Sequence, residues 1–140
     1  MTIKSVAHVC IKTTDLDATS RFYCDALGMK KHFNFVKNGR TIGFYMKASD
    51  NRTFVEVFLV DNAPPSSTAC TLSHFCLETD SLEQTWRNLV EAGYKPGDMK
   101  MGADATPQFW MKDPNGMDLE FQQYTAESSQ QTGRDVEVNW

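Results

Sequence analysis

The stretch Val6-Ala7-His8-Val9-Cys10-Ile11 returns in similar form as Leu72-Ser73-His74-Phe75-Cys76-Leu77. Each stretch has the order apolar, small, histidine, apolar, cysteine, apolar, and each is followed within a few residues by Thr-Asp and the start of a predicted helix. Similarity at a fixed offset along a chain is typical of a fold built from repeated supersecondary units. We therefore expect two halves with one common architecture.

Both halves follow the same order of elements, which is a strand, a helix and about three further strands. The helices are predicted over 15–27 and 81–92, because each has an N-cap side chain, an apolar stripe of helical period and a glycine at its end. Ser81 and Gln84 form a predicted capping box, and Asn38-Gly39 predicts a tight hairpin turn. The strands are predicted over 6–11, 29–36, 41–46, 53–60, 72–77, 95–101, 108–111 and 117–123.

The predicted domain organisation follows from this repeat. The chain has 140 residues, and we expect a single domain over about 1–125. Module 1 covers about 1–61 and module 2 about 70–125, and a linker rich in proline and serine joins them over 62–69. Residues 126–140 form a polar C-terminal tail.

The charge balance and the hydropathy pattern exclude several classes of function. The chain has 14 Lys+Arg against 18 Asp+Glu, whereas proteins that bind nucleic acid usually carry a basic surplus. No apolar run approaches the roughly 20 residues that span a bilayer, and the first eight residues lack the apolar region of a signal peptide. The four cysteines contain no Cys-x-x-Cys pair. We expect a cytoplasmic protein with reduced thiols and with no nucleic-acid or membrane partner.

Two glutamates lie inside apolar strands at matching positions of the repeat. Glu56 follows His8 by 48 residues, and Glu120 follows His74 by 46. A carboxylate is seldom buried unless it is paired or binds a metal. Any one of these four residues, taken alone, is more often a hydrogen-bonded core histidine or an edge glutamate. All four at matching positions favour a divalent transition-metal site, since two imidazoles and two carboxylates suit such an ion.

The chain resembles the vicinal oxygen chelate superfamily, which includes glyoxalase I, bleomycin-resistance proteins, thiol transferases, epimerases and extradiol dioxygenases. The resemblance covers about residues 3–124 and implies an α+β fold in which two βαβββ modules form an open barrel around a metal site. It rests on the order and spacing of several short pieces, namely His8-Val9-x-Ile11, Phe22-Tyr23, Leu27-Gly28-Met29, His74 and Asp113-Pro114-Asn115-Gly116 before Leu119-Glu120.

The resemblance implies that His8, Glu56, His74 and Glu120 are the metal ligands. This full set is most similar to that of glyoxalase I, a lyase that transfers a proton next to a carbonyl through a metal-stabilised enediolate. Glu120 is then the principal catalytic base, and Glu56 is a ligand and second acid/base. The short chain resembles bacterial-type enzymes, which implies Ni²⁺ or Co²⁺ in preference to Zn²⁺.

The expected substrate is a small molecule, but its identity stays open. Glyoxalases of this type usually hold glutathione with an arginine and an asparagine, where this chain has Lys12 and Val60. The use of glutathione is therefore open. Aromatic residues near the ligands are pocket candidates and equally core candidates. The predicted substrate-binding residues are Lys12, Phe54, Phe58, Lys100 and Trp110, with Phe109 and Lys112 as further candidates.

Two other functions remain as alternatives. One is an Fe²⁺- or Mn²⁺-dependent extradiol-type dioxygenase, in which Glu56 would not bind the metal. The other is a non-catalytic protein that binds a small molecule, as resistance proteins do. The resemblance also implies a homodimer, in which the ligands of one site come from one chain or from two. Cys10 and Cys76 are expected to be small core residues, and His32 a surface residue.

Overall fold

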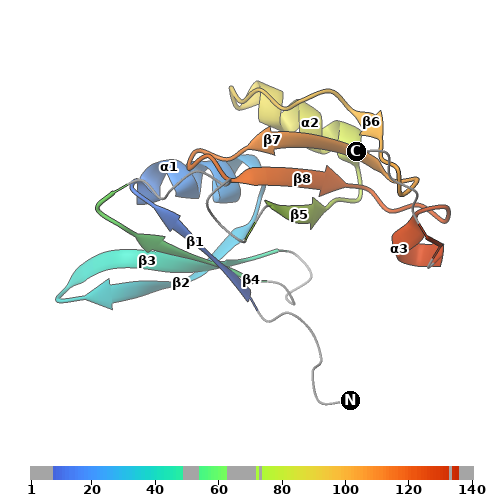
Figure 1. The fold of residues 1–140 in the computed structure, drawn as a ribbon. Helices are drawn as coiled ribbons and strands as arrows, with labels where there is room; N and C mark the ends of the chain where they lie inside the picture. Colours follow the sequence, from blue (N-terminus) through green and yellow to red (C-terminus); the bar gives the residue numbers. More distant parts are fainter. Residues whose placement is uncertain (1–7, 49–53, 63–71, 73, 133, 136–140) are drawn as a thin grey trace, which may run out of the picture. The chain divides into compact units, whose positions relative to one another are not determined.

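The computed structural model describes residues 8–48, 54–62, 72, 74–132 and 134–135. The chain divides into two compact units, Met1–Pro65 and Ser66–Trp140. Each unit contains one four-stranded sheet (Figure 1). The start of the first predicted strand and most of the predicted linker lie outside the described residues.

The first unit has a mixed sheet with the strand order β1-β4-β3-β2. β1 pairs with β4 in parallel, and the two other pairs are antiparallel. The elements are β1 (His8–Thr13), α1 (Leu16–Ser20), the π-helix η1 (Arg21–Ala26), β2 (Lys30–Lys37), β3 (Arg40–Lys47) and β4 (Phe54–Leu59).

The second unit repeats this topology with the strand order β5-β8-β7-β6, and β5 pairs with β8 in parallel. The predicted pair of βαβββ modules and the α+β class are therefore confirmed. The elements are β5 (His74–Glu78), α2 (Leu82–Glu91), β6 (Lys100–Met101), β7 (Pro107–Lys112), β8 (Asp118–Gln122) and the short α3 (Ser129–Thr132), which lies in the predicted tail.

The first predicted helix is divided into α1 and the wider turn of η1. Asp15 caps it as predicted, because its carboxylate accepts a hydrogen bond from the backbone N–H of Ala18 at 2.9 Å. In the π segment, Leu27 N–H donates to the carbonyl of Phe22, five residues earlier. Phe22 and Tyr23 are both fully buried there, with their rings edge to face at 4.9 Å.

The second predicted helix has only half of its predicted capping box. The Ser81 hydroxyl accepts from the N–H of Gln84 at 3.3 Å, but the Gln84 side chain binds Asn88 and does not reach back. The backbone N–H of Ser81 donates to Thr79 Oγ1, so this donor is satisfied by an earlier residue. Gln123, after β8, accepts from the first N–H of α2, on Leu82, at 2.9 Å.

The predicted strand 95–101 is largely absent, and only Lys100–Met101 forms β6. Pro96 has no N–H with which to extend a ladder. Gly97 still donates to the carbonyl of Trp110 at 2.8 Å. A Cβ at Gly97 would lie 2.9 Å from that carbonyl oxygen, so the segment approaches β7 too closely for most side chains.

Strand alternation gives each sheet one core face and one opposite face. The core faces carry the fully or nearly fully buried apolar residues, and α1 contacts β4 while α2 contacts β7. The core residues of the first unit include Ile11, Phe22, Tyr23, Phe44, Met46, Val55 and Val57, and those of the second Leu82, Leu89, Phe109, Leu119 and Phe121. The opposite faces carry Glu56 and Glu120.

The hairpin between β2 and β3 turns at Asn38-Gly39, as predicted, with φ of 51° and 75°. Both angles lie in the left-handed region that a type I′ turn requires. Because a Cβ in this region costs about 1–2 kcal/mol, we expect Gly39→Ala to lower the free energy of unfolding by about 1 kcal/mol in urea titrations. Lys37→Ala, at an exposed position just before the turn, is the control. Equal stability of both variants would contradict this turn geometry.

No helix among the described residues is long and apolar enough to cross a bilayer.

Candidate functional site

The parallel pair of β5 and β8 brings His74 and Glu120 together. Cys76 is paired with Glu120 in register and His74 with Asp118, so all four side chains lie on the face opposite the core. His74 Nε2 lies 3.6 Å from Glu120 Oε2, which is longer than an ordinary hydrogen bond. Two ligands at roughly 2.1 Å from one metal ion are themselves separated by about 3.0–3.4 Å. At 3.6 Å the pair is slightly wider than this range, so a small movement of either side chain would let both bind one ion.

Glu120 is the buried member of this pair. Its side chain is 11% exposed, whereas that of His74 is 39% exposed. Burial raises the pKa of Glu120, and the nearby Asp104 adds to the rise, while His74 and the hydrogen bonds from Gln122 and Cys76 act against it. A carboxyl group with a raised pKa in such a setting is suited to taking up and returning a proton.

Trp110 packs against His74 from β7, which is separated from β5 by β8 in the sheet. It lies opposite Glu120 in the register of β7 and β8. Its ring meets the imidazole edge to face, with 4.7 Å between centroids and 65° between planes. This contact limits the orientations of His74. The prediction that Trp110 binds substrate is not tested by this contact.

The first unit has the same register. β1 and β4 are parallel, and Cys10 is paired with Glu56 as Cys76 is with Glu120. Glu56 is half-buried, and Tyr45 lies opposite it on β3 where β7 has Trp110. His8 lies in β1, two residues before Cys10, but its side chain is outside the described part of the structure. Glu56 therefore occupies the same place in its sheet as Glu120.

Two of the four predicted ligands, His74 and Glu120, lie close together within the second unit. No group of three or more His, Cys, Asp or Glu side chains among the described residues is arranged to hold a metal. Binding of one ion by all four predicted ligands remains a prediction.

The expectation that Cys10 and Cys76 are small core residues is wrong. Both are exposed residues on the glutamate faces. Desolvation of the sulfur, with the adjacent carboxylate of Glu120, raises the pKa of Cys76 to about 12, so this thiol stays protonated at neutral pH. Burial and Glu56 raise the pKa of Cys10 in the same way.

The predicted substrate-binding residues occupy different settings. Lys12 is exposed and lies opposite Phe58, on the face of Glu56. Phe58 is half-buried, and its ring lies 4.5 Å from that of Phe35. The side chain of Phe54 is outside the described residues. Lys100 is exposed on the edge strand β6, where it pairs with Gln108 in register.

The two further candidates, Phe109 and Lys112, each make a defined contact within the second unit. Phe109 is fully buried and stacks on Phe121 with 4.6 Å between ring centroids, so it belongs to the core. Lys112 Nζ lies 2.5 Å from Asp118 Oδ1, in an exposed ion pair across the two strands. His32 is exposed, as predicted.

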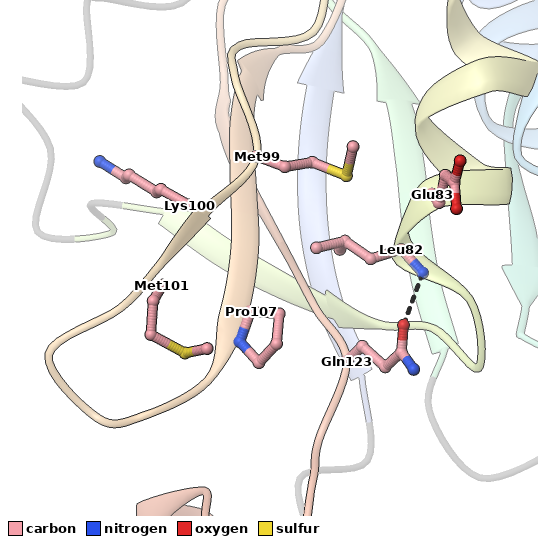
Figure 2. A pocket seen from close by; sticks show the side chains of 7 residues that line it. All are labelled: Leu82, Glu83, Met99, Lys100, Met101, Pro107 and Gln123. Carbon is pink, nitrogen blue, oxygen red and sulfur yellow. Dashed lines mark hydrogen bonds between the residues drawn. The ribbon is translucent and has the colours of Figure 1, made fainter.

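A groove of about 350 Å³ lies at the start of α2 (Figure 2). In the figure, Met99 points toward Leu82, while the Lys100 side chain extends away from the groove. The lining residues are Leu82, Glu83, Met99, Lys100, Met101, Pro107 and Gln123, so neither His74 nor Glu120 contributes to it.

Sequence reasoning did not identify Gln122, which donates to Glu120 Oε1 from its Nε2 at 3.1 Å. Gln122 is 5% exposed. The available signal was strand alternation, because a polar residue two positions after Glu120 shares its face. Its partner Asp104 lies 18 residues away in a loop and had no signal in the sequence.

Two βαβββ modules, one of which pairs a histidine with a buried glutamate on the face opposite its core, are the architecture of vicinal oxygen chelate proteins. The chain belongs to the Glyoxalase/Bleomycin resistance protein/Dioxygenase superfamily, whose family model matches residues 5–121.

The comparisons with single proteins agree with this membership. The chain is 25% identical over 122 residues to the uncharacterized protein YaeR of Escherichia coli (strain K12), which covers 84% of this chain and 95% of that protein. The structure of a glyoxalase family protein from Enterococcus faecalis aligns with a TM-score of 0.74 and 24% identity, over 87% of this chain and 99% of that one.

Two further solved structures have this fold and different described roles. A lactoylglutathione lyase from Agrobacterium tumefaciens aligns with a TM-score of 0.66 and 16% identity, over 88% of this chain and 96% of that one. TnmS3, an antibiotic binding protein from Streptomyces sp. CB03234, aligns with a TM-score of 0.67 and 20% identity, over 89% and 99%. At these identities the likeness shows the fold alone.

Proposed function

We propose that this protein is a metal-dependent lyase or isomerase of the glyoxalase I type, which moves a proton between carbons next to a carbonyl. The observation that carries this proposal is the spacing of 3.6 Å between His74 Nε2 and the buried carboxylate of Glu120. The matching register of Glu56 in the first unit supports it. A protein that only sequesters a small molecule needs none of these groups.

The proposed metal ligands are His74, Glu120, His8 and Glu56, supplied by one chain or by two. The donor set of imidazoles and carboxylates suits Ni²⁺, Co²⁺ or Zn²⁺. When bound, the ion would polarise the carbonyl oxygen of the substrate as a Lewis acid.

Glu120 is the proposed proton carrier. Its burial disfavours the charged form and so raises its proton affinity, which favours uptake of a proton from a carbon acid. Gln122 holds Oε1 by a hydrogen bond, while Oε2 is the oxygen nearest His74. Glu56 is the proposed second acid/base.

The proposed substrate is a small α-hydroxycarbonyl compound or the adduct of an α-ketoaldehyde with a thiol. Lys12 is exposed on the face of Glu56 and is the proposed contact for an anionic group, with Phe54, Phe58, Lys100 and Trp110 as further proposed contacts. We also propose a cytoplasmic homodimer, whose mass light scattering would measure. A monomer with full metal occupancy would contradict sites shared between chains.

The function is tested by metal analysis and turnover. The purified protein is reconstituted separately with Ni²⁺, Co²⁺, Zn²⁺, Fe²⁺ and Mn²⁺, and the bound metal is quantified. We expect stoichiometric Ni²⁺ or Co²⁺ and turnover of methylglyoxal in the presence of glutathione or another thiol. His32→Ala, which removes the exposed histidine, is the control and keeps full metal content.

Other outcomes would favour the alternatives. Oxygen consumption with a catechol and Fe²⁺ or Mn²⁺, together with unchanged metal binding by Glu56→Ala, would favour the dioxygenase. Absence of bound metal after every reconstitution would contradict both enzymes and favour a binding protein.

A further inference from the structure

The side chain of Gln122 connects Glu120 to a second carboxylate. Its Nε2 lies 3.1 Å from Glu120 Oε1, 3.2 Å from Asp104 Oδ2 and 3.2 Å from Gln108 Oε1. An amide nitrogen has two hydrogens, so three acceptors share two donors. The residue is 5% exposed, so water replaces these partners poorly. The strength of the bond to Glu120 therefore depends on how well the other acceptors are satisfied.

The C-terminal helix α3 supplies a competing donor to Asp104. Gln130 Nε2 donates to Asp104 Oδ2 at 2.6 Å and, over a longer 3.4 Å, to Gln122 Oε1, and Gln130 Oε1 accepts from Thr106 Oγ1 at 3.0 Å. The backbone N–H of Ser129 donates to the carbonyl of Asp104 at 2.9 Å. The start of α3 is thus fixed to the loop after β6 by three separate hydrogen bonds.

Asp104 is held in its charged form by these donors. Burial alone would raise its pKa, but hydrogen bonds from Gln130, Thr106 and Gln122 outweigh burial and lower the pKa of Asp104. A charged carboxylate is a strong acceptor. Without the donor from Gln130, Asp104 would draw the amide of Gln122 toward itself and away from Glu120.

We propose that Gln122 is a positioning residue for Glu120 and that α3, through Gln130 and Asp104, sets the strength of its hydrogen bond. This inference rests on the proposed role of Glu120 as ligand and proton carrier. The family match ends at residue 121, so Gln122 and α3 lie beyond the segment that the family model describes. On this proposal, α3 contributes to the function of the site in this chain.

Gln122 would position Glu120 because one carboxylate oxygen has to be fixed while the other binds the metal. A glutamate that holds a metal and exchanges a proton has three rotatable bonds, and a hydrogen bond to Oε1 leaves Oε2 directed to His74. Outer-shell hydrogen bonds to ligating groups typically change metal affinity or activity by about 10–100-fold.

The test is a double-mutant cycle on Ni²⁺ affinity of the full-length protein. We expect Gln122→Met to raise the Kd about 10-fold. Gln130→Ala is expected to raise it about 3-fold, since Gln130 reaches Glu120 only indirectly, through Asp104 and the Gln122 side chain. Gln130→Ala is expected to have no further effect in the Gln122→Met background. The control Gln131→Ala changes an exposed neighbour whose side chain makes no hydrogen bond to the described residues, and it keeps the wild-type Kd.

A second readout does not require metal. The side-chain amide resonances of Gln122 in ¹⁵N-labelled, metal-free protein are expected to shift in Gln130→Ala and to stay in place in Gln131→Ala.

Two results would overturn the inference. Additive effects in the double-mutant cycle would show that α3 only supports the fold, and wild-type Ni²⁺ affinity in Gln122→Met would show that Gln122 does not position Glu120. If Gln122→Met does not fold, the inference is tested with Gln130→Ala alone, which changes an exposed residue. A wild-type Kd for Ni²⁺ together with unshifted Gln122 resonances in that variant would then overturn it. A wild-type protein that binds no metal contradicts the proposed function, and the resonances alone then decide whether α3 acts on Gln122.

Discussion

Glu120→Gln is expected to lower kcat of the proposed proton-transfer reaction by about 10²–10⁴-fold, the range that a positioned acid/base group contributes. Glutamine has nearly the same volume and can still accept the hydrogen bond from Gln122 through its amide oxygen. The fold is therefore expected to survive, with an unchanged melting temperature. The substitution removes the charge and the proton-carrying oxygen, and it weakens metal binding. Activity is measured at saturating metal, so that the loss in kcat is separated from the loss in affinity.

Glu91→Gln is the matched control for this experiment, because Glu91 is an exposed glutamate at the end of α2. It is expected to keep wild-type kcat. Glu56→Gln provides the comparison between the two modules and is expected to have the smaller effect on kcat, since Glu120 is the proposed principal base. A larger loss in Glu56→Gln would assign that role to the first module. Wild-type turnover by Glu120→Gln would contradict the proposed chemistry.

The repeat predicted the fold because it records the hydrogen-bonded register of two equivalent sheets. Each histidine strand is parallel to the glutamate strand of its own half, and the cysteine two residues after the histidine is paired with the glutamate in both. Local turn signals such as Asn38-Gly39 were equally reliable, since a left-handed backbone restricts residue choice within two positions.

Features that depend on distant residues were not predictable in this way. The hydrogen bonds of Gln122 and Gln130 to Asp104 join residues 18 and 26 positions apart. Asp104 and Gln130 belong to no repeat and to no periodic pattern. The π turn after α1 likewise has no signal in the apolar spacing, because that spacing was compatible with a regular helix over 15–27. The sequence predicted the candidate ligands and missed the groups that orient one of them.

The exposure of Cys10 and Cys76 has a related cause. Both residues follow the expected alternation and share a face with the histidine and glutamate of their strand pair. They were expected in the core because cysteine is usually buried. Their face is the one opposite the apolar core in each sheet, so residue type gave the wrong prediction where strand period gave the right one.

The adjacent pair Phe109 and Trp110 separates the two faces of β7 experimentally. Phe109 is fully buried and stacked on Phe121, so Phe109→Ala is expected to lower the free energy of unfolding by about 3–5 kcal/mol in urea titrations, the usual cost of truncating a core phenylalanine. Trp110 is half-buried against His74, and Trp110→Ala is expected to lower the free energy of unfolding by a smaller amount, about 1–2 kcal/mol.

The two variants are also expected to differ in Ni²⁺ binding, where Trp110→Ala has the larger effect. Trp110→Ala frees the imidazole of His74, so it is expected to weaken Ni²⁺ binding, whereas the Phe109→Ala protein that remains folded keeps the metal-binding face and its Kd. Neighbouring residues of one strand then report separately on stability and on the site, because alternation sends their side chains to opposite faces. Equal stability losses, or a loss of Ni²⁺ affinity in folded Phe109→Ala alone, would contradict this assignment of the two faces.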